Sequence, residues 1–212
     1  MRIRPLYGAW LLLCVVGMAS AADLSFQEAS PGALPKGWTT AQTGEGEGSV
    51  WEVVDDASSP DKGKALAQVA ADAPRALFNL CVADKFSLTD VELTVAVKAV
   101  AGKIDQGGGP VWRYQDANNY YIARVNPLEN NYRVYKVVDG VRTELASADM
   151  KIPSGQWLKI HIVHRGNHIE CHLNDKLLLN VADDGISEAG QIGLWTKADA
   201  QTRFAGVVVE GN

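Results

Sequence analysis

The stretch from Asp105 to Lys136 holds the densest mixture of aromatic and polar side chains in the sequence. A sugar ligand requires this mixture, because its C–H faces stack on aromatic rings while its hydroxyl groups need hydrogen-bond partners. An alternative stays open, since aromatic residues that alternate along strands are normally core residues and the cluster could be purely structural. The candidate ligand-binding residues of this stretch are Arg113, Tyr120, Arg124, Glu129, Asn130, Tyr135 and Lys136.

Carboxylates in the same stretch raise the question of glycosidic-bond cleavage. That reaction needs two carboxyl groups, about 5–5.5 Å apart for retention or about 6.5–9.5 Å apart for inversion. The nearest candidates are Asp105, Asp116 and Glu129, and their spacing in the sequence does not identify any two of them as a catalytic pair. No catalytic residue is therefore predicted. The glycines at 107–109 lack the helix and the lysine of a phosphate-binding loop, and they predict a sharp bend or a close backbone approach.

Three histidine and glutamate residues flank the dipeptide Gly166-Asn167. A two-residue hairpin turn there would pair Arg165 with His168, Val163 with Glu170 and His161 with His172. His161, Glu170 and His172 would then share one face, and this residue set can bind a transition metal. The favoured interpretation is an ordinary solvated sheet face, so no cofactor is predicted. A calcium ion held by backbone carbonyls would leave no sequence signature and stays an open alternative.

The elements that must position these residues are strands. Apolar residues recur with period two in short runs that are bounded by Gly, Asp, Asn or Pro, which predicts strands rather than helices. The Gly- and Pro-rich segment 31–49 is predicted to be a surface loop. So many short strands joined by hairpins predict an all-β, two-sheet antiparallel jelly-roll sandwich. The predicted strands are 50–54, 65–69, 76–82, 91–97, 111–115, 120–126, 132–138, 142–146, 157–164, 168–173, 176–181, 191–196 and 203–209.

The first residues have the layout of a secretory signal peptide. Arg2 and Arg4 precede an apolar stretch that ends on the small residues 19–22. We expect cleavage near Ala22, a secreted or periplasmic location, and one sandwich domain over residues 23–212. A lipid anchor at Cys14 is disfavoured, because a large residue precedes the cysteine.

The charge pattern excludes some classes of partner. The formal net charge is −5, and the Lys and Arg residues are scattered rather than gathered in a basic patch. Nucleic acid is therefore not an expected partner, and the apolar stretch is too short for a membrane span. A glycan or small sugar is the expected partner of a monomer. Cys81 and Cys171 would remain after cleavage, either as one disulfide or, as we favour, as two buried thiols.

Three segments carry a family resemblance: PKGWTTAQTGEGEGSVWEV at 35–53, GKIDQGGGPVWRYQDANNYYIARVNPLENNYRVYKVVDG at 102–140 and EAGQIGLWTKADAQTRF at 188–204. The chain resembles the 3-keto-disaccharide hydrolase family of secreted bacterial domains, which are similar to concanavalin A-like lectins and glucanases. The resemblance implies a jelly-roll sandwich whose concave sheet binds or processes sugars. A hydrolase or lyase acting on 3-keto-disaccharides and a non-catalytic structural domain of the envelope are the alternatives. Similar proteins read Phe-Asp-Asp where this chain has Phe204-Ala205-Gly206, so any role of those aspartates is lost.

Overall fold

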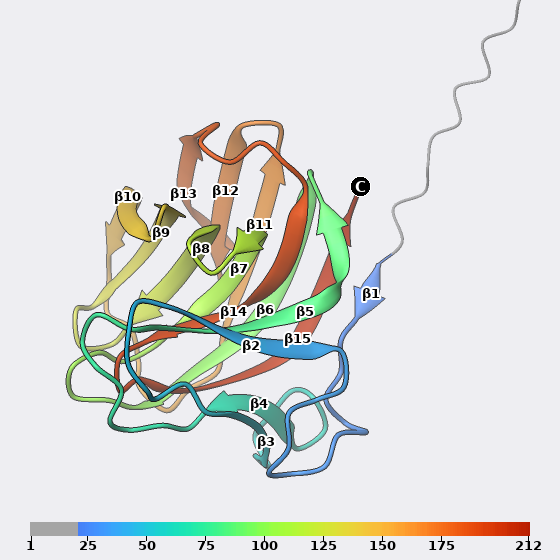
Figure 1. Ribbon diagram of the computed structural model, residues 1–212, viewed down its shortest axis with the longest axis vertical. Helices are drawn as coiled ribbons and strands as arrows, with labels where there is room; N and C mark the ends of the chain where they lie inside the picture. Colours follow the sequence, from blue (N-terminus) through green and yellow to red (C-terminus); the bar gives the residue numbers. More distant parts are fainter. Residues whose placement is uncertain (1–20) are drawn as a thin grey trace, which may run out of the picture.

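The computed structural model describes residues 21–212, and every regular element in this part of the chain is a strand. The strands form two antiparallel sheets that face each other (Figure 1). The predicted all-β sandwich is confirmed. The predicted signal peptide lies almost entirely outside the described residues and stays a prediction. Within residues 21–212 no helix is long and apolar enough to cross a membrane.

Sheet A has eight strands in the order β13-β12-β11-β6-β15-β4-β3, and β1 pairs with β15 beside this path. Figure 1 shows β1 and β15 side by side near the C-terminus. The bounds in sheet A are β1 (Ala22–Asp23), β3 (Trp51–Asp55), β4 (Lys64–Gln68), β6 (Val91–Ala101), β11 (Leu158–Arg165), β12 (His168–Leu173), β13 (Lys176–Ala182) and β15 (Gln201–Gly211).

Sheet B has seven strands in the order β10-β9-β8-β7-β14-β5-β2. Strands β7 to β10 are joined by consecutive β-hairpins, whereas β14 lies between β7 and β5, so residues far apart in sequence meet on the faces of the sheet. The bounds in sheet B are β2 (Trp38–Thr43), β5 (Phe78–Leu88), β7 (Gly109–Asp116), β8 (Asn119–Asn126), β9 (Asn131–Val138), β10 (Val141–Asp149) and β14 (Gly190–Lys197).

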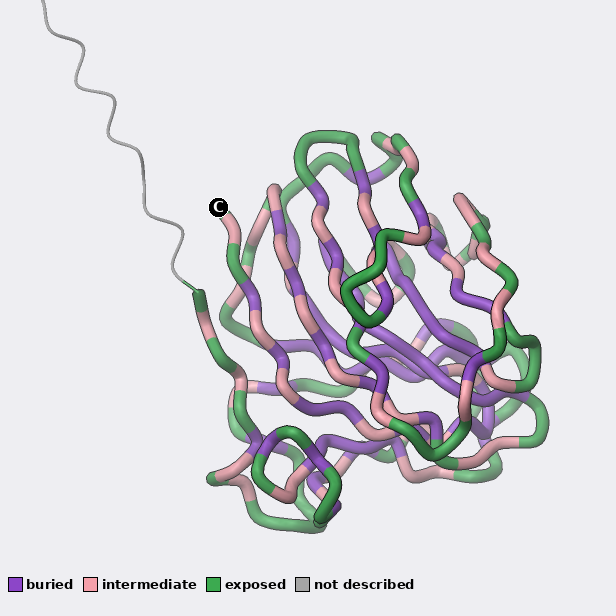
Figure 2. The backbone as a smooth tube through the Cα atoms, turned by 180° about the vertical axis from the view of Figure 1, so that it is seen from behind, coloured by how far each residue is buried: buried purple, intermediate pink, exposed green. Residues whose placement is uncertain are grey.

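Alternating burial along the strands of sheet A explains how the core forms. On β6, Val91, Leu93, Val95 and Val97 are buried, and the residues between them are partly exposed. Because successive side chains point to opposite faces, this pattern places one apolar face against sheet B. Figure 2 shows the same alternation of buried and partly exposed residues along the strands, with exposed residues at the turns.

The structure corrects the sequence prediction in one segment. Residues 31–49 were expected to form a loop, but residues 38–43 form β2, which pairs with β5 through the register Ala41 to Leu80. The segment reads Trp-Thr-Thr-Ala-Gln-Thr and lies at the edge of sheet B, so only one of its sides needs a hydrogen-bonding partner. An edge strand tolerates this polar composition, and the period-two apolar signal is correspondingly weak.

Two other predictions are settled by the strand pairing. The hairpin at Gly166-Asn167 has the predicted register, with Arg165 opposite His168 and His161 opposite His172. Cys81 on β5 and Cys171 on β12 are free and buried in the core, so the disulfide alternative is wrong. Burial raises the pKa of both thiols, which therefore behave as small hydrophobic groups.

Candidate functional site

Sheet B is apolar on both faces. One face packs on sheet A, and the opposite face, called here the outer face of sheet B, carries a second hydrophobic cluster. Because the cross-strand register alternates the faces, residues such as Leu80, Trp195 and Ile122 all point outward. The cluster comprises Phe78, Leu80, Val82, Val111, Tyr120, Ile122, Tyr135, Val137 and Trp195, with Ala41 and Tyr114 packed against it.

A pocket of about 240 Å³ lies at one end of the outer face of sheet B. We call it the Tyr114 pocket. The Tyr114 ring is half-buried and stacks on Tyr120, with 6.0 Å between the ring centroids. Around the ring, Thr39 donates a hydrogen bond to the Asp84 carboxylate at 2.8 Å, and Gln191 lies on the adjacent strand. The pocket is lined by Thr39, Ala41, Val82, Asp84, Tyr114 and Gln191.

An ionic network occupies the opposite end of the same face. Arg124 of β8 lies directly across from Arg133 of β9, and like charges in that position repel each other. Glu129 compensates, because its Oε2 accepts a hydrogen bond from Nη2 of Arg124 at 2.7 Å and lies 3.5 Å from Nη1 of Arg133. Burial opposes ionisation of Glu129, but the hydrogen bonds from Arg124 and Asn131 and the charges of Arg124 and Arg133 together outweigh it and lower the pKa of Glu129. Glu144 forms an ion pair with Arg133 at 3.3 Å.

Arg142 of β10 lies between these two regions. It pairs in register with Val137, a member of the outer hydrophobic cluster, so its side chain extends over that cluster. The centre of its guanidinium lies 4.5 Å from the ring centroid of Tyr135, 5.2 Å from that of Phe78 and 5.7 Å from that of Trp195. Such contacts stabilise a cation over aromatic faces.

The structure brings some of the predicted ligand-binding residues together. Arg124, Glu129 and Tyr135 meet within hydrogen-bonding distance, since Nη2 of Arg124 also donates to the Tyr135 hydroxyl at 3.0 Å. Tyr120 is buried on the same face, and its hydroxyl lies 2.7 Å from Oγ1 of Thr43. Asn130 has a positive φ in the turn before β9, and its Oδ1 accepts the backbone N–H of Ile152.

Two predicted residues lie elsewhere. Arg113 is buried, and its guanidinium donates to the backbone carbonyls of Thr89, Gly166 and Ile186, which belong to three separate turns and loops. Lys136 donates to Oδ2 of Asp183 at 2.7 Å. Arg113 and Lys136 therefore tie together chain segments, and neither joins the network around Glu129.

The candidate catalytic carboxylates are also separated. Asp105 is buried, accepts a hydrogen bond from Asn126 and forms an ion pair with Lys197 at 3.2 Å. Asp116 caps the turn before β8, where it accepts hydrogen bonds from the backbone N–H of Asn118 and the side chain of Asn119. Both carboxylates are thus used by local structure.

The histidine cluster has the predicted placement on β11 and β12. The rings of His161 and His172 face each other with centroids 5.1 Å apart. Nε2 of His161 lies 3.0 Å from Glu92, whereas Nε2 of His172 lies 3.4 Å from Glu170. Within residues 21–212 no group of three or more His, Cys, Asp or Glu side chains is arranged to hold a metal ion.

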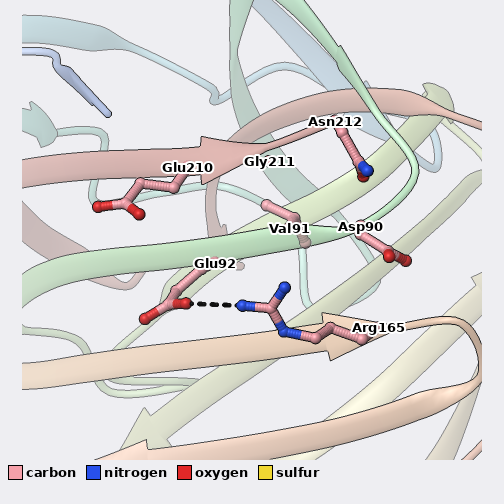
Figure 3. Close-up of a pocket in the computed structure, with 7 residues that line it drawn as sticks. All are labelled: Asp90, Val91, Glu92, Arg165, Glu210, Gly211 and Asn212. Atoms are coloured by element: carbon pink, nitrogen blue, oxygen red, sulfur yellow. Dashed lines mark hydrogen bonds and ion pairs between the residues drawn. The ribbon is translucent and has the colours of Figure 1, made fainter. Parts of the chain in front are cut away.

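A pocket of about 210 Å³ on sheet A lies where β6, β11 and β15 run side by side. Figure 3 shows Arg165 reaching toward Glu92, with Asp90 and Glu210 nearby. Oε2 of Glu92 lies 3.1 Å from Arg165, and Asp90 accepts the backbone N–H of Gly166 at 2.8 Å. Glu92 and Arg165 thus bind each other across this pocket, and no aromatic ring lines it.

Sequence reasoning missed the most informative residues of the outer face of sheet B. Asp84, Gln191 and Trp195 lie outside the stretch 105–136, and Arg142 lies just beyond its end. The strand order β9-β8-β7-β14-β5 is what joins them to that stretch. The sequence around position 142 gives no signal of its own, because Arg142 and Glu144 alternate with Val141, Thr143 and Leu145 as on an ordinary strand.

The protein is an antiparallel jelly-roll sandwich in which the outer face of sheet B combines a hydrophobic aromatic cluster with an ionic network and the Tyr114 pocket. The chain matches the 3-keto-alpha-glucoside-1,2-lyase-like domain family over residues 26–210 and belongs to that family. This match confirms the family resemblance of the sequence. No curated protein sequence matches the chain.

Solved structures share the fold at low sequence identity. The carbohydrate binding module CBM66 from Bacillus subtilis superimposes with a TM-score of 0.65 at 21% identity, covering 82% of this chain and 96% of that chain. Domain 4 of AbnA, a GH43 extracellular arabinanase from Geobacillus stearothermophilus in complex with arabinotriose, gives 0.54 at 12% identity, covering 82% of each chain. The exoplasmic/lumenal domain of VIP36, in a Ca2+/Man-bound form, gives 0.57 at 13% identity, covering 90% and 88%.

Proposed function

We propose that this protein binds a carbohydrate on the outer face of sheet B, with a sugar ring against Tyr114. The Tyr114 pocket carries the proposal, because it places a half-buried aromatic ring beside a carboxylate, an amide and a hydroxyl group. The ring offers a stacking surface for sugar C–H groups, and Asp84 and Gln191 offer an acceptor and a donor for hydroxyl groups. The named sugar-binding neighbours, a carbohydrate binding module and a domain in complex with arabinotriose, support the proposal.

Calorimetric titration of purified protein against a panel of oligosaccharides tests this function. For a glycan that binds, Tyr114→Ala is expected to weaken affinity at least about ten-fold, which corresponds to ~1.4 kcal/mol. Trp157→Ala is the matched control, because Trp157 is a partly exposed aromatic residue directly before β11 of sheet A. If Tyr114→Ala and Trp157→Ala bind equally well, the pocket is not the site. If no glycan binds, the structural alternative replaces the proposal.

A catalytic role is the second candidate, and one observation favours it. Glu129 and Glu144 both lie within ion-pair distance of Arg133, so two carboxylates with similar partly exposed side chains meet on the same sheet face as the Tyr114 pocket. The family description names a 3-keto-alpha-glucoside lyase-like domain. Incubation with a 3-keto-disaccharide, with and without divalent metal, is expected to release monosaccharides if this role holds. Unchanged substrate would dismiss it without affecting the binding proposal.

Export of the chain and a calcium requirement are smaller proposals of the same kind. The charged start, apolar stretch and small-residue exit of residues 1–22 support secretion to the periplasm or beyond, and mass spectrometry of the exported chain would show cleavage near Ala22.

Calcium held by backbone carbonyls would raise the melting temperature above that measured in EDTA, because a ligand that binds the folded state stabilises it. An identical melting temperature would remove calcium from the description.

A further inference from the structure

Arg142 differs from the other cations of the outer face of sheet B in its bonding. Arg124 and Arg133 both bind Glu129, and Lys197 binds Asp105. Among residues 21–212, no carboxylate lies within ion-pair distance of Arg142, and no hydrogen bond from its guanidinium is present, although a guanidinium carries five N–H donors. The groups in direct contact with its guanidinium are aromatic rings.

The orientation of the guanidinium leaves one edge available. Its Cζ atom lies over the rings of Tyr135, Phe78 and Trp195. Its Nη1 atom is buried without a hydrogen-bond partner, whereas Nε and Nη2 are not among the buried unpartnered atoms. Because Nε and Nη2 also make no hydrogen bond within the protein, the edge that they form reaches solvent. This Nε–Nη2 edge matches the two oxygens of a carboxylate.

The surroundings favour an anion at this edge. Burial lowers the pKa of Arg142, which means that the charged form is under-solvated, although arginine stays protonated at neutral pH. A carboxylate that arrives with its ligand would supply the missing counter-charge where water is partly excluded and charge-assisted hydrogen bonds are strong.

We infer that the glycan bound by this protein carries a carboxylate, as in a uronic acid, and that Arg142 binds this carboxylate. The inference rests on the proposed function and adds the class of sugar. The Tyr114 pocket would hold a sugar ring, while Arg142, over the adjoining aromatic residues of the same sheet face, would select the acidic group. The pocket and the arginine contribute separately, so their effects can be separated by mutation.

Calorimetric titration with acidic oligosaccharides and their carboxyl-reduced counterparts tests the inference. Probes are oligogalacturonate and glucuronate-substituted xylo-oligosaccharide, each compared with the same chain after reduction of its carboxyl groups. The acidic form is expected to bind at least about ten-fold more tightly than the reduced form, which is the gain that one bidentate charged contact would give. Arg142→Met should abolish this preference, and Arg142→Lys should retain only part of it because the ammonium lacks the fork.

A control variant and folding measurements distinguish failure of the carboxylate inference from failure of the glycan-binding proposal. Lys176→Met removes an exposed positive charge from β13 of the other sheet and should leave the preference unchanged. Melting temperatures of all variants establish that they are folded. Equal binding of the acidic and reduced forms, a preference that survives Arg142→Met, or tighter binding of a sulfated oligosaccharide would overturn the inference while leaving glycan binding intact. Absence of binding to every probe and to neutral glycans would overturn both.

Discussion

Trp112 of β7 donates its indole N–H to Nδ1 of His164 of β11 at 2.9 Å, so one side-chain hydrogen bond joins the two sheets through the core. Both residues are fully buried. The Trp112 ring also stacks on Tyr121, and the His164 imidazole meets Tyr121 edge-on. An acceptor at Nδ1 requires the neutral imidazole, and the fold therefore depends on an uncharged histidine.

This relationship predicts a specific loss of stability in weak acid. Burial, aided by the charge of Arg113, lowers the pKa of His164 from 6.5 to about 4. Between these values the unfolded chain binds a proton that the folded chain does not, so the free energy of unfolding falls as the pH drops from about 6.5 toward 4. The loss should reach roughly 3 kcal/mol, at about 1.4 kcal/mol per pKa unit.

His164→Gln isolates this effect, because glutamine can accept the Trp112 hydrogen bond through an oxygen that does not titrate in this range. Urea unfolding at pH 7 and pH 4.5 would measure it. The difference in unfolding free energy between the two pH values should be smaller in the variant than in the parent. The same pH dependence in both proteins would remove His164 as its source.

Arg113 is predicted to be a structural clamp. Its guanidinium is buried and donates hydrogen bonds to the backbone carbonyls of Thr89, Gly166 and Ile186. Arg113→Met should leave all three without this donor and cost about 3 kcal/mol or more, read as a lower denaturant midpoint. Glycan affinity of the folded variant should be unchanged. Weaker glycan binding at full stability would instead support Arg113 as a ligand-binding residue.

Asp183 should stabilise the link between sheet B and the segment after β13. Its carboxylate accepts the Tyr121 hydroxyl at 2.6 Å and the Lys136 ammonium at 2.7 Å. Burial opposes ionisation, but these hydrogen bonds, the backbone N–H of Gly185 and the charge of Lys136 together outweigh it and lower the pKa of Asp183. Asp183→Asn should therefore destabilise the protein by about 1–3 kcal/mol in thermal or urea unfolding.

The exposed ion pair of Asp175 with Lys159 provides the comparison, since the Asp175 side chain is 74% exposed. Asp175→Asn should have no measurable effect, because solvent screens exposed pairs. Equal effects of Asp183→Asn and Asp175→Asn would contradict the assignment of Asp183 as a link.

Gly109 is predicted to be indispensable for the approach of β7 to β8. A Cβ at this position would lie 1.9 Å from the backbone oxygen of Ala123. Gly109→Ala must therefore displace backbone, and it should cost several kcal/mol, more than the 1–3 kcal/mol typical of overpacking by flexible side chains. At Gly155 no atom lies within 4 Å of an added Cβ, so Gly155→Ala should cost only its positive-φ strain, about 1 kcal/mol. Similar melting temperatures for the two variants would refute the steric argument.

Part of the site was predictable because it is local. Glu129 follows Arg124 by five residues and binds it across the turn between β8 and β9, and both were candidates from sequence. The hairpin of β11 and β12 was predictable for the same reason, since a two-residue turn sets the register. The family resemblance pointed to the same sandwich.

The faces of β7, β8 and β9 were not predictable. Their burial is nearly continuous, because one face packs on sheet A and the other carries the outer hydrophobic cluster. A strand that is buried on both faces loses the period-two signal that distinguishes core from surface. Arg113 in addition has a positive φ within an irregularity of the β7–β8 pairing between Trp112 and Asp116, and this break in the alternation gave no sequence signal for its side of the sheet.

The sequence by itself determined most of the strands, the tight turns and the family of this protein, because these depend on residues close together in the chain. Only the tertiary structure decided what lies on the outer face of sheet B. Arg142 and Trp195 come from β10 and β14, which are separated in the sheet by β9, β8 and β7. Their contact depends on the order and curvature of all these strands, and side-chain alternation along one strand carries no information about either.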